Sequence, residues 1–191
     1  MSKQVKEIRN TLLKEFRKST KCHEWFVNEH VLVVEKLALE LCKHYPEANK
    51  DAVLLSVWFH DIGRIHGISK DHDVYGADYA KEYLSKKSFS TSLIDIIYQA
   101  CRSHRCKDVL PQSIEAKIIA TSDALSHFHN GFYLRILYSK SRRGKDFQKI
   151  REKILKKIDR DYNKKLLLPV AKEATKPFYR AWTQVIKEIS L

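Results

Sequence analysis

Residues 51–61 read DAVLLSVWFHD, a segment that is apolar nearly all round and ends in a His-Asp pair. Apolar residues on every face predict a helix buried in the middle of a bundle rather than one lying on its surface. His60 continues the row of Val53 and Val57, and Asp61 continues the next row. Adjacent residues on a helix diverge by about 100°, yet both side chains can reach one point beyond the helix end. The segment therefore predicts a central helix with a polar site at its C-terminus.

Helical spacing recurs along the rest of the chain, which has only 5 Gly and 4 Pro and no sustained two-residue alternation. The fold class is therefore predicted to be all-α. Helices are expected at about 3–18, 28–44, 49–61, 71–86, 91–104, 113–128, 146–162 and 166–189. Ser90 or Thr91 and Ser113 are the expected N-caps of the fifth and sixth helices, and Gly131 is the expected end of the sixth. Pro177 is expected to bend or divide the last helix.

One domain spanning residues 1–191 is the natural interpretation, since no repeat or low-complexity linker interrupts it. Within it, residues of about 20–130 bear the polar motifs. Residues 131–191 form a basic helical elaboration, with 17 Lys or Arg against 6 Asp or Glu out of a formal net charge of +13. Such a field favours anionic partners, either a small phosphorylated substrate or nucleic acid, although a solvated lysine-rich surface would carry the same charge.

Composition excludes several classes of protein. With 43% hydrophobic and 31% charged residues, the chain is neither disordered nor a membrane protein. No apolar run approaches the length of a membrane span, and the sequence MSKQVKEIRN at the start has no signal-peptide character. The four cysteines form no CxxC pair, so they are expected to be reduced thiols in a cytoplasmic protein. The oligomeric state is left open.

Several ionisable residues fall on the apolar stripes of their predicted helices. His30 shares a face with Val34, His72 with Gly76, and His104 with Ala100, as the helical period requires. Asp123 shares a face with Ala116 and Ala120, and His127 lies one turn further. A buried carboxylate or imidazole is costly unless it is paired or coordinated. His30, His60, Asp61 and Asp123 include no basic residue, so together they are expected to need a cation, which a divalent metal would supply.

The ordered set of His30, the pair in WFHDIGR and the aspartate in AKIIATSDAL resembles the HD-domain superfamily of metal-dependent phosphohydrolases over about residues 20–130. The resemblance implies an all-α helical bundle and a divalent metal held by His30, His60, Asp61 and Asp123. It also implies hydrolysis of phosphoester or phosphoanhydride bonds, often in nucleotides. Imidazole and carboxylate ligands suit Mn, Fe, Co, Ni or Zn better than Ca.

Three more residues belong to the predicted site. His72 and His104 match, in order and helix face, the additional histidines of two-metal relatives, so one or two metals per chain are expected. If they bind no second metal, they become candidates for substrate contact. Asp61 is the leading catalytic residue because it completes one metal site or bridges two. Arg64 is the second, because its planar fork suits a phosphate oxygen, although it could equally be a cation at a helix C-terminus.

Two other functions remain open from the sequence. The resemblance also covers HD-domain oxygenases, in which the same six ligands hold two irons. Alternatively, the chain is a non-catalytic nucleotide- or RNA-binding module, because aromatic and cationic residues interleave in residues 128–143, FHNGFYLRILYSKSRR, as they do in stacking surfaces. An amphipathic helical core explains that segment as easily.

Overall fold

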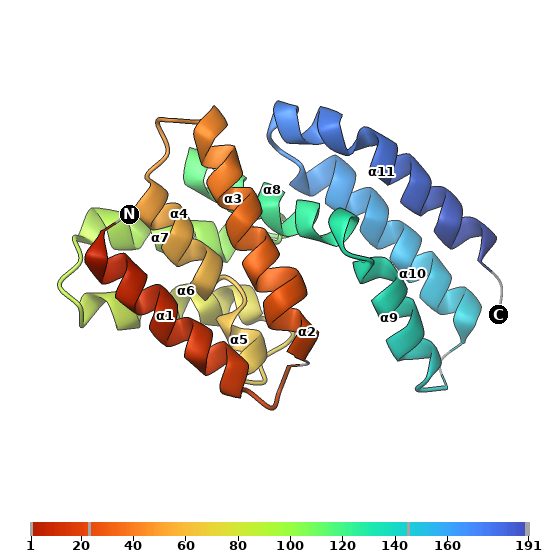
Figure 1. Cartoon of the computed structure of the whole chain (residues 1–191), viewed down its shortest axis with the longest axis horizontal. Helices are drawn as coiled ribbons and strands as arrows, with labels where there is room; N and C mark the ends of the chain where they lie inside the picture. Colours follow the sequence, from red (N-terminus) through yellow and green to blue (C-terminus); the bar gives the residue numbers. More distant parts are fainter. Residues whose placement is uncertain (1, 23, 145, 190–191) are drawn as a thin grey trace.

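The structure is a computed structural model that describes residues 2–22, 24–144 and 146–189, and these residues form helices and no strand (Figure 1). The predicted all-α class is confirmed. The elements, in chain order, are α1 (Lys3–Lys18), α2 (Glu24–Phe26), η1 (Val27–Val31), α3 (Leu32–His44), α4 (Lys50–Phe59), α5 (Ile62–Ile65), α6 (His72–Ser85), α7 (Thr91–Ser103), α8 (Ile114–His129), α9 (Phe132–Ser141), α10 (Phe147–Arg160), η2 (Asp161–Lys165) and α11 (Pro169–Glu188).

Helix α4 is central, as its all-round apolar sequence predicts. Every residue from Ala52 to Phe59 is buried, and the helix packs against α1, α3, α7 and α8. Its first turn is capped by Asn49, whose side-chain oxygen accepts hydrogen bonds from the backbone N–H groups of Asp51 and Ala52. Since α4 is enclosed on all sides, its C-terminal end, where His60 and Asp61 follow, opens inside the protein rather than at its surface.

Helix α8 joins the two parts of the molecule. It is buried along nearly its whole length because α3 and α7 pack on it from the first two thirds of the chain, while α9, η2 and α11 pack on it from the last third. Figure 1 shows it running from the first group of helices to the second. The expected N-caps, Ser90 for α7 and Ser113 for α8, both accept backbone hydrogen bonds through their side chains.

The basic C-terminal helices pack through narrow apolar stripes. In α10 the stripe is Ile150, Ile154 and Ile158, spaced four residues apart, and the helix packs against α9 and α11. Their lysines and arginines occupy the remaining faces.

No described helix is both long and apolar enough to cross a membrane.

Two short π-helical turns interrupt the α-helical course. In η1 the Leu32 N–H donates to the carbonyl of Val27, and in η2 the Leu166 N–H donates to the carbonyl of Asp161, both across five residues. Such turns insert one residue into a helix and recur at functional sites because they redirect side chains. The first contains His30 and the second contains Lys165.

Three sequence predictions need correction. The predicted set of helices omits Phe132–Ser141, although an amphipathic helical core was one of the two interpretations of residues 128–143; only Tyr133 and Leu137 of this helix are buried. The third helix ends at Phe59 rather than at residue 61, because the chain turns there into α5. Pro177 lies inside α11 without dividing it; the residue is exposed, so water can satisfy the carbonyl that loses its partner.

Candidate metal centre

Five histidines and two aspartates meet in the interior where several helix ends converge. His60 caps the end of α4, Asp61 begins α5, His72 begins α6, and His104 caps the end of α7. The other three, His30 in η1 and Asp123 and His127 in α8, lie within helical elements. All seven are buried, with at most 5% of each residue exposed.

Asp61 lies between two pairs of histidines, one at each of its carboxylate oxygens. Its Oδ2 is 3.2 Å from Nε2 of His30 and 3.7 Å from Nε2 of His60. Its Oδ1 is 3.1 Å from Nε2 of His72 and 3.9 Å from Nε2 of His104. A carboxylate placed in this way has the geometry to bridge two cations, one on each oxygen.

Asp123 completes the cluster on the His30 side. Its Oδ1 is 3.6 Å from Nε2 of His30 and 3.5 Å from Nε2 of His127, while its Oδ2 accepts a hydrogen bond from the Lys165 ammonium. The lysine thus occupies one oxygen and leaves the other directed at the histidines. It fixes the orientation of the carboxylate in the way that outer hydrogen bonds orient metal ligands.

Every one of the five imidazoles is held through Nδ1, so that Nε2 faces the carboxylates. In three of them Nδ1 donates to a backbone carbonyl of a residue three positions earlier, at 2.7 Å for His60, 2.9 Å for His72 and 2.6 Å for His104. His30 is held by Ser126 at 2.9 Å and His127 by Asp161 at 2.9 Å. With the proton on Nδ1, each Nε2 offers a lone pair to the centre.

The electrostatics favour neutral imidazoles beside ionised carboxylates. Burial lowers the pKa of His60 and of His72 and lowers that of His104 well below its usual value. Burial alone would raise the pKa of Asp61, but the adjacent Arg64 and the surrounding histidines outweigh it and hold that pKa well below its ordinary range. Neutral imidazole and carboxylate are the protonation states that metal ligands require.

A divalent metal fits this set of donors. Nε2 of His60 is buried and has no hydrogen-bond partner, which is costly in a protein interior unless a cation accepts its lone pair. Three groups have ligand atoms close enough to share one ion: His30, His60 and Asp61; His30, Asp123 and His127; and Asp61, His72 and His104. The mixture of imidazole and carboxylate is typical of transition-metal sites rather than of calcium sites.

The structure brings together all six predicted ligands and places Arg64 beside them. The four predicted metal ligands contain no basic residue, but both acids of that set pair with basic residues outside it. Arg64 Nε donates to Asp61 Oδ1 at 2.8 Å, and Lys165 pairs with Asp123 from 42 residues away. The sequence could not place Lys165 because its approach depends on how η2 packs on α8.

His127 is the inward residue that the predicted site omitted. Its position one turn after Asp123 on the same face was the available signal. Its Nδ1 is tied to Asp161, which is fully buried and also accepts a hydrogen bond from the Tyr133 hydroxyl at 3.1 Å. Burial, together with the cation of Lys157, lowers the pKa of His127 to about 4.

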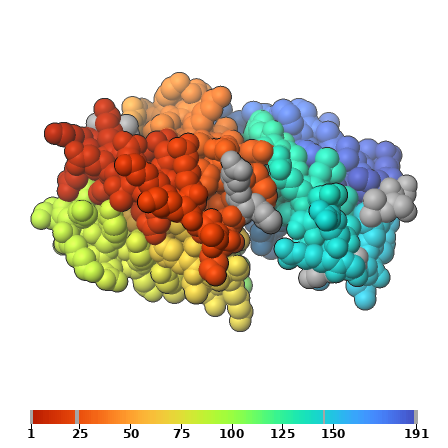
Figure 2. All heavy atoms as spheres, turned by 60° about the horizontal axis from the view of Figure 1, so that its bottom comes forward, coloured from red at the N-terminus to blue at the C-terminus, as the bar shows by residue number. Residues whose placement is uncertain are grey.

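These residues line a pocket of about 190 Å³ to which both parts of the chain contribute: Phe26, His30, Asp61, Arg64, Ser69, His72, His104, Arg105, Asp123, His127, Phe132, Lys157, Arg160 and Lys165. Figure 2 shows the surface hollowed where the first two thirds of the chain meet the C-terminal third. The centre is therefore reached from solvent through a small cationic pocket.

Comparison with known proteins agrees with this geometry. The HD domain family matches residues 27–127, which is more than half of the chain and contains all seven residues of the cluster. A solved structure of a predicted HD superfamily hydrolase from an uncultured Thermotogales bacterium shares the fold, with a TM-score of 0.65 and 21% identity over 95% of this chain and 88% of that one. No curated protein matches. The chain belongs to the HD domain family.

Proposed function

We propose that the protein is a metal-dependent phosphohydrolase that cleaves a phosphoester or phosphoanhydride bond in a nucleotide or a small phosphorylated metabolite. The observation that carries the proposal is the position of Asp61, whose two oxygens face separate histidine pairs inside a pocket lined by cations. Metal ions bound there would polarise a phosphoryl oxygen and supply hydroxide from water at neutral pH.

The residues of the centre would bind the metal ions, orient the ligands and contact the substrate. His30, His60, Asp61 and Asp123 would hold one ion, while Asp61, His72 and His104 would hold a second. The backbone and side-chain acceptors on each Nδ1 keep the imidazoles in place. The Arg64 side chain lines the pocket and is 37% exposed. Its guanidinium can contact a phosphoryl oxygen while its Nε keeps the hydrogen bond to Asp61.

Replacing Arg64 separates substrate binding from metal binding. We expect Arg64→Ala to lower kcat/KM by about 10- to 100-fold, the value of one or two charge-assisted hydrogen bonds, without loss of metal. Arg64→Lys should recover only part of the activity because an ammonium cannot form a planar fork. Steady-state kinetics with parallel metal analysis measures both. An unchanged kcat/KM in Arg64→Ala would return the residue to a helix-capping role.

The number of metals follows from the same geometry. Anaerobically purified, metal-replete protein should contain close to two metals per chain, falling to about one in the His72→Ala, His104→Ala double variant. His66 and His129, which lie outside the cluster, provide a control double variant that should keep two. A wild-type content of one that the double variant leaves unchanged would reject the two-metal site and spare the hydrolase.

The activity itself is tested by phosphate release from a panel of nucleotides and small phosphoesters, using the protein loaded with Mn, Fe, Co, Ni or Zn. Release from at least one substrate that depends on added metal supports the proposal. Absence of release from every member, in protein shown to contain metal, would argue against it.

An HD-domain di-iron oxygenase is the second candidate, and the bridging position of Asp61 is what favours it. The pocket's arginines and lysines suit a phosphonate or another organic anion as well as a phosphate ester. Oxygen uptake by the iron-loaded protein, without phosphate release, would identify this class.

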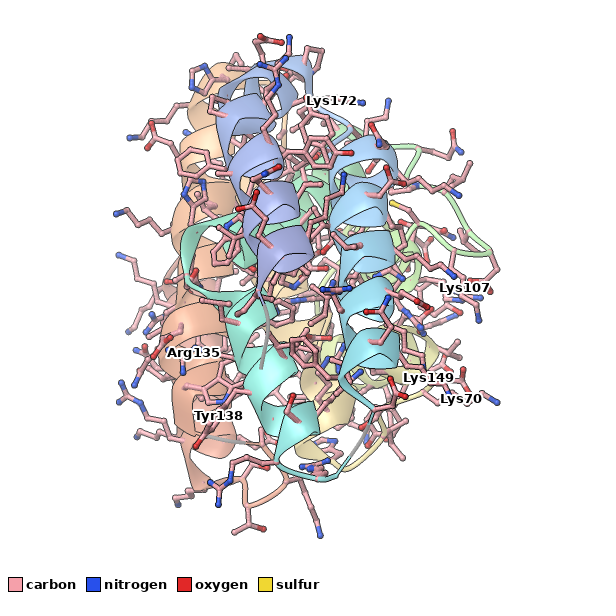
Figure 3. All side chains as sticks on the ribbon, turned by 90° about the vertical axis from the view of Figure 1, so that its right-hand side faces the viewer. Lys70, Lys107, Arg135, Tyr138, Lys149 and Lys172 are labelled. Atoms are coloured by element: carbon pink, nitrogen blue, oxygen red, sulfur yellow. The ribbon has the colours of Figure 1, made fainter. Side chains whose placement is uncertain are left out.

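Nucleic acid or nucleotide binding without catalysis rests on a different surface. A hollow of about 610 Å³ beside α9 is lined by Trp25, Arg135, Ile136, Tyr138, Ser139, Lys140, Arg142 and Arg143. The Arg135 guanidinium lies over the Trp25 ring, and Tyr138 is 65% exposed; Figure 3 shows Arg135 and Tyr138 on the same helix. Salt-dependent binding of a single-stranded RNA oligonucleotide that Tyr138→Ala weakens would support this candidate.

A further inference from the structure

A second group of cations reaches the pocket from outside the part of the chain that matches the HD domain family. Lys157 and Arg160 at the end of α10, and Lys165 in η2, all line the pocket of the candidate metal centre. The family match ends at residue 127, so this wall belongs to the basic C-terminal third.

The π-helical turn η2 directs Lys165 to the same side as Lys157. In an uninterrupted α-helix, Lys165 would point about 80° away from Lys157, but the extra residue in η2 reduces the difference to about 20°. The turn closes through the bond from the Leu166 N–H to the Asp161 carbonyl at 3.2 Å. Two lysines eight residues apart are thereby directed into one pocket.

Each cation is positioned by a carboxylate and retains donors for a ligand. The Lys157 ammonium donates to Asp161 Oδ2 at 2.7 Å and lies 5.2 Å from the centre of the Phe132 ring. Arg160 Nη2 is 3.6 Å from the other oxygen of Asp161, and 45% of its side chain is exposed. An ammonium has three donors and a guanidinium five, so one carboxylate does not exhaust either of them.

The charge of the pocket exceeds what one phosphate monoester neutralises. Five cations line it, from Arg64, Arg105, Lys157, Arg160 and Lys165, and they pair with four carboxylates, from Asp61, Asp73, Asp123 and Asp161. One positive charge is left over, and each divalent ion adds two. A phosphate monoester brings only about −1.5 to −2, and uncompensated charge is costly in a partly buried pocket.

The pocket is also small. Its volume of about 190 Å³ lies below the roughly 300–1,000 Å³ of sites that enclose a whole drug-sized ligand. It has room for phosphoryl groups, while the remainder of a substrate would extend towards solvent.

We propose that Lys157, Arg160 and Lys165 form an anion subsite beside the metal centre, so that the substrate carries two phosphoryl groups rather than one. This rests on the proposed hydrolase function and narrows its substrate class to diphosphates and bisphosphates. One phosphoryl group would lie at the metal centre, where hydrolysis is proposed, and Lys157, Arg160 and Lys165 would bind the second.

Binding without turnover tests the subsite directly. Titration calorimetry of metal-loaded protein with inorganic phosphate and with methylenebisphosphonate, a diphosphate analogue that resists hydrolysis, should give at least tenfold tighter binding of the bisphosphonate. The Lys157→Met, Arg160→Gln double variant should reduce that preference at least tenfold. Lys156→Gln removes a cation from an exposed neighbouring position in α10 and should leave both affinities unchanged.

Turnover by metal-loaded protein gives the second readout, using substrate pairs that differ by one phosphoryl group, such as nucleoside 5′-monophosphates and the matching 3′,5′-bisphosphates. The double variant should raise KM for the doubly phosphorylated member at least tenfold more than for its partner. Equal binding of phosphate and methylenebisphosphonate by wild type, or equal losses in the variant, would overturn the subsite. A preference for the bisphosphonate with no hydrolysis of any substrate pair would instead overturn the hydrolase and keep the subsite.

Discussion

Asp61→Ala is expected to abolish phosphate release, lowering kcat/KM on the order of 10³-fold or more, because one carboxylate serves both halves of the centre. The same variant should lose most of its bound metal. Helical circular dichroism should remain nearly intact, since Asp61 lies between α4 and α5 and forms no part of the apolar core.

Asp95→Ala provides the matched control, because Asp95 is an exposed carboxylate on α7, away from the pocket. It should keep both metal and activity. Full activity in Asp61→Ala, with the control also active, would remove the assignment of the centre as a whole. Loss of activity with full metal content would place Asp61 in substrate chemistry alone.

The largest effect on stability is expected at Gly76, where α6 crosses the end of α4. A Cβ added there would lie 2.5 Å from the carbonyl oxygen of Phe59 and 3.2 Å from that of His60. Gly76→Ala should therefore push α6 away from the end of α4 and from His60, one of the proposed metal ligands. Overpacking of this kind costs about 1–3 kcal/mol, which corresponds to a fall in Tm of about 2–12 °C for a chain of this size.

Asp78→Ala, at an exposed position on the same helix, should leave Tm within about 1 °C. Thermal unfolding followed by circular dichroism compares the two variants, and metal content is measured on the same samples. A Gly76→Ala protein as stable as wild type would mean that α6 does not approach α4 as closely as the structure places it.

The helices that could be predicted from the sequence are those whose pattern of apolar and polar residues matches the pattern of burial in the structure. Helix α4 is apolar on all faces and is buried on all faces. Helix α1 was predicted with the bounds that the structure has, because Val5, Ile8, Leu12 and Phe16 form a clean stripe between polar ends. Helix α9 buries only Tyr133 and Leu137, and its interleaved aromatic and basic residues suit a stacking surface as well as an amphipathic helix, so the sequence left both interpretations open.

The residues of the site also fall into a group that the sequence could predict and a group that it could not. His60 and Asp61 adjoin in sequence, and His30, His72, His104 and Asp123 each lie on an apolar stripe, so local pattern alone indicated that they point inwards. Lys157, Asp161 and Lys165 lie in a strongly charged segment where a buried lysine looks like any surface lysine. Only the packing of η2 on α8, with α10 leading into η2, brings them to the centre, and no local pattern contains that information.

If Asp61 bridges two metal ions, as we propose, anomalous diffraction from crystals of the Mn- or Zn-loaded protein should locate both of them. Two anomalous peaks are expected about 3.5–4 Å apart. One should be bound by His30, His60, Asp61 and Asp123, the other by Asp61, His72 and His104, with every imidazole coordinating through Nε2. A single peak would reject the bridge, and the absence of any peak within bonding distance of Asp61 would contradict the metal centre itself.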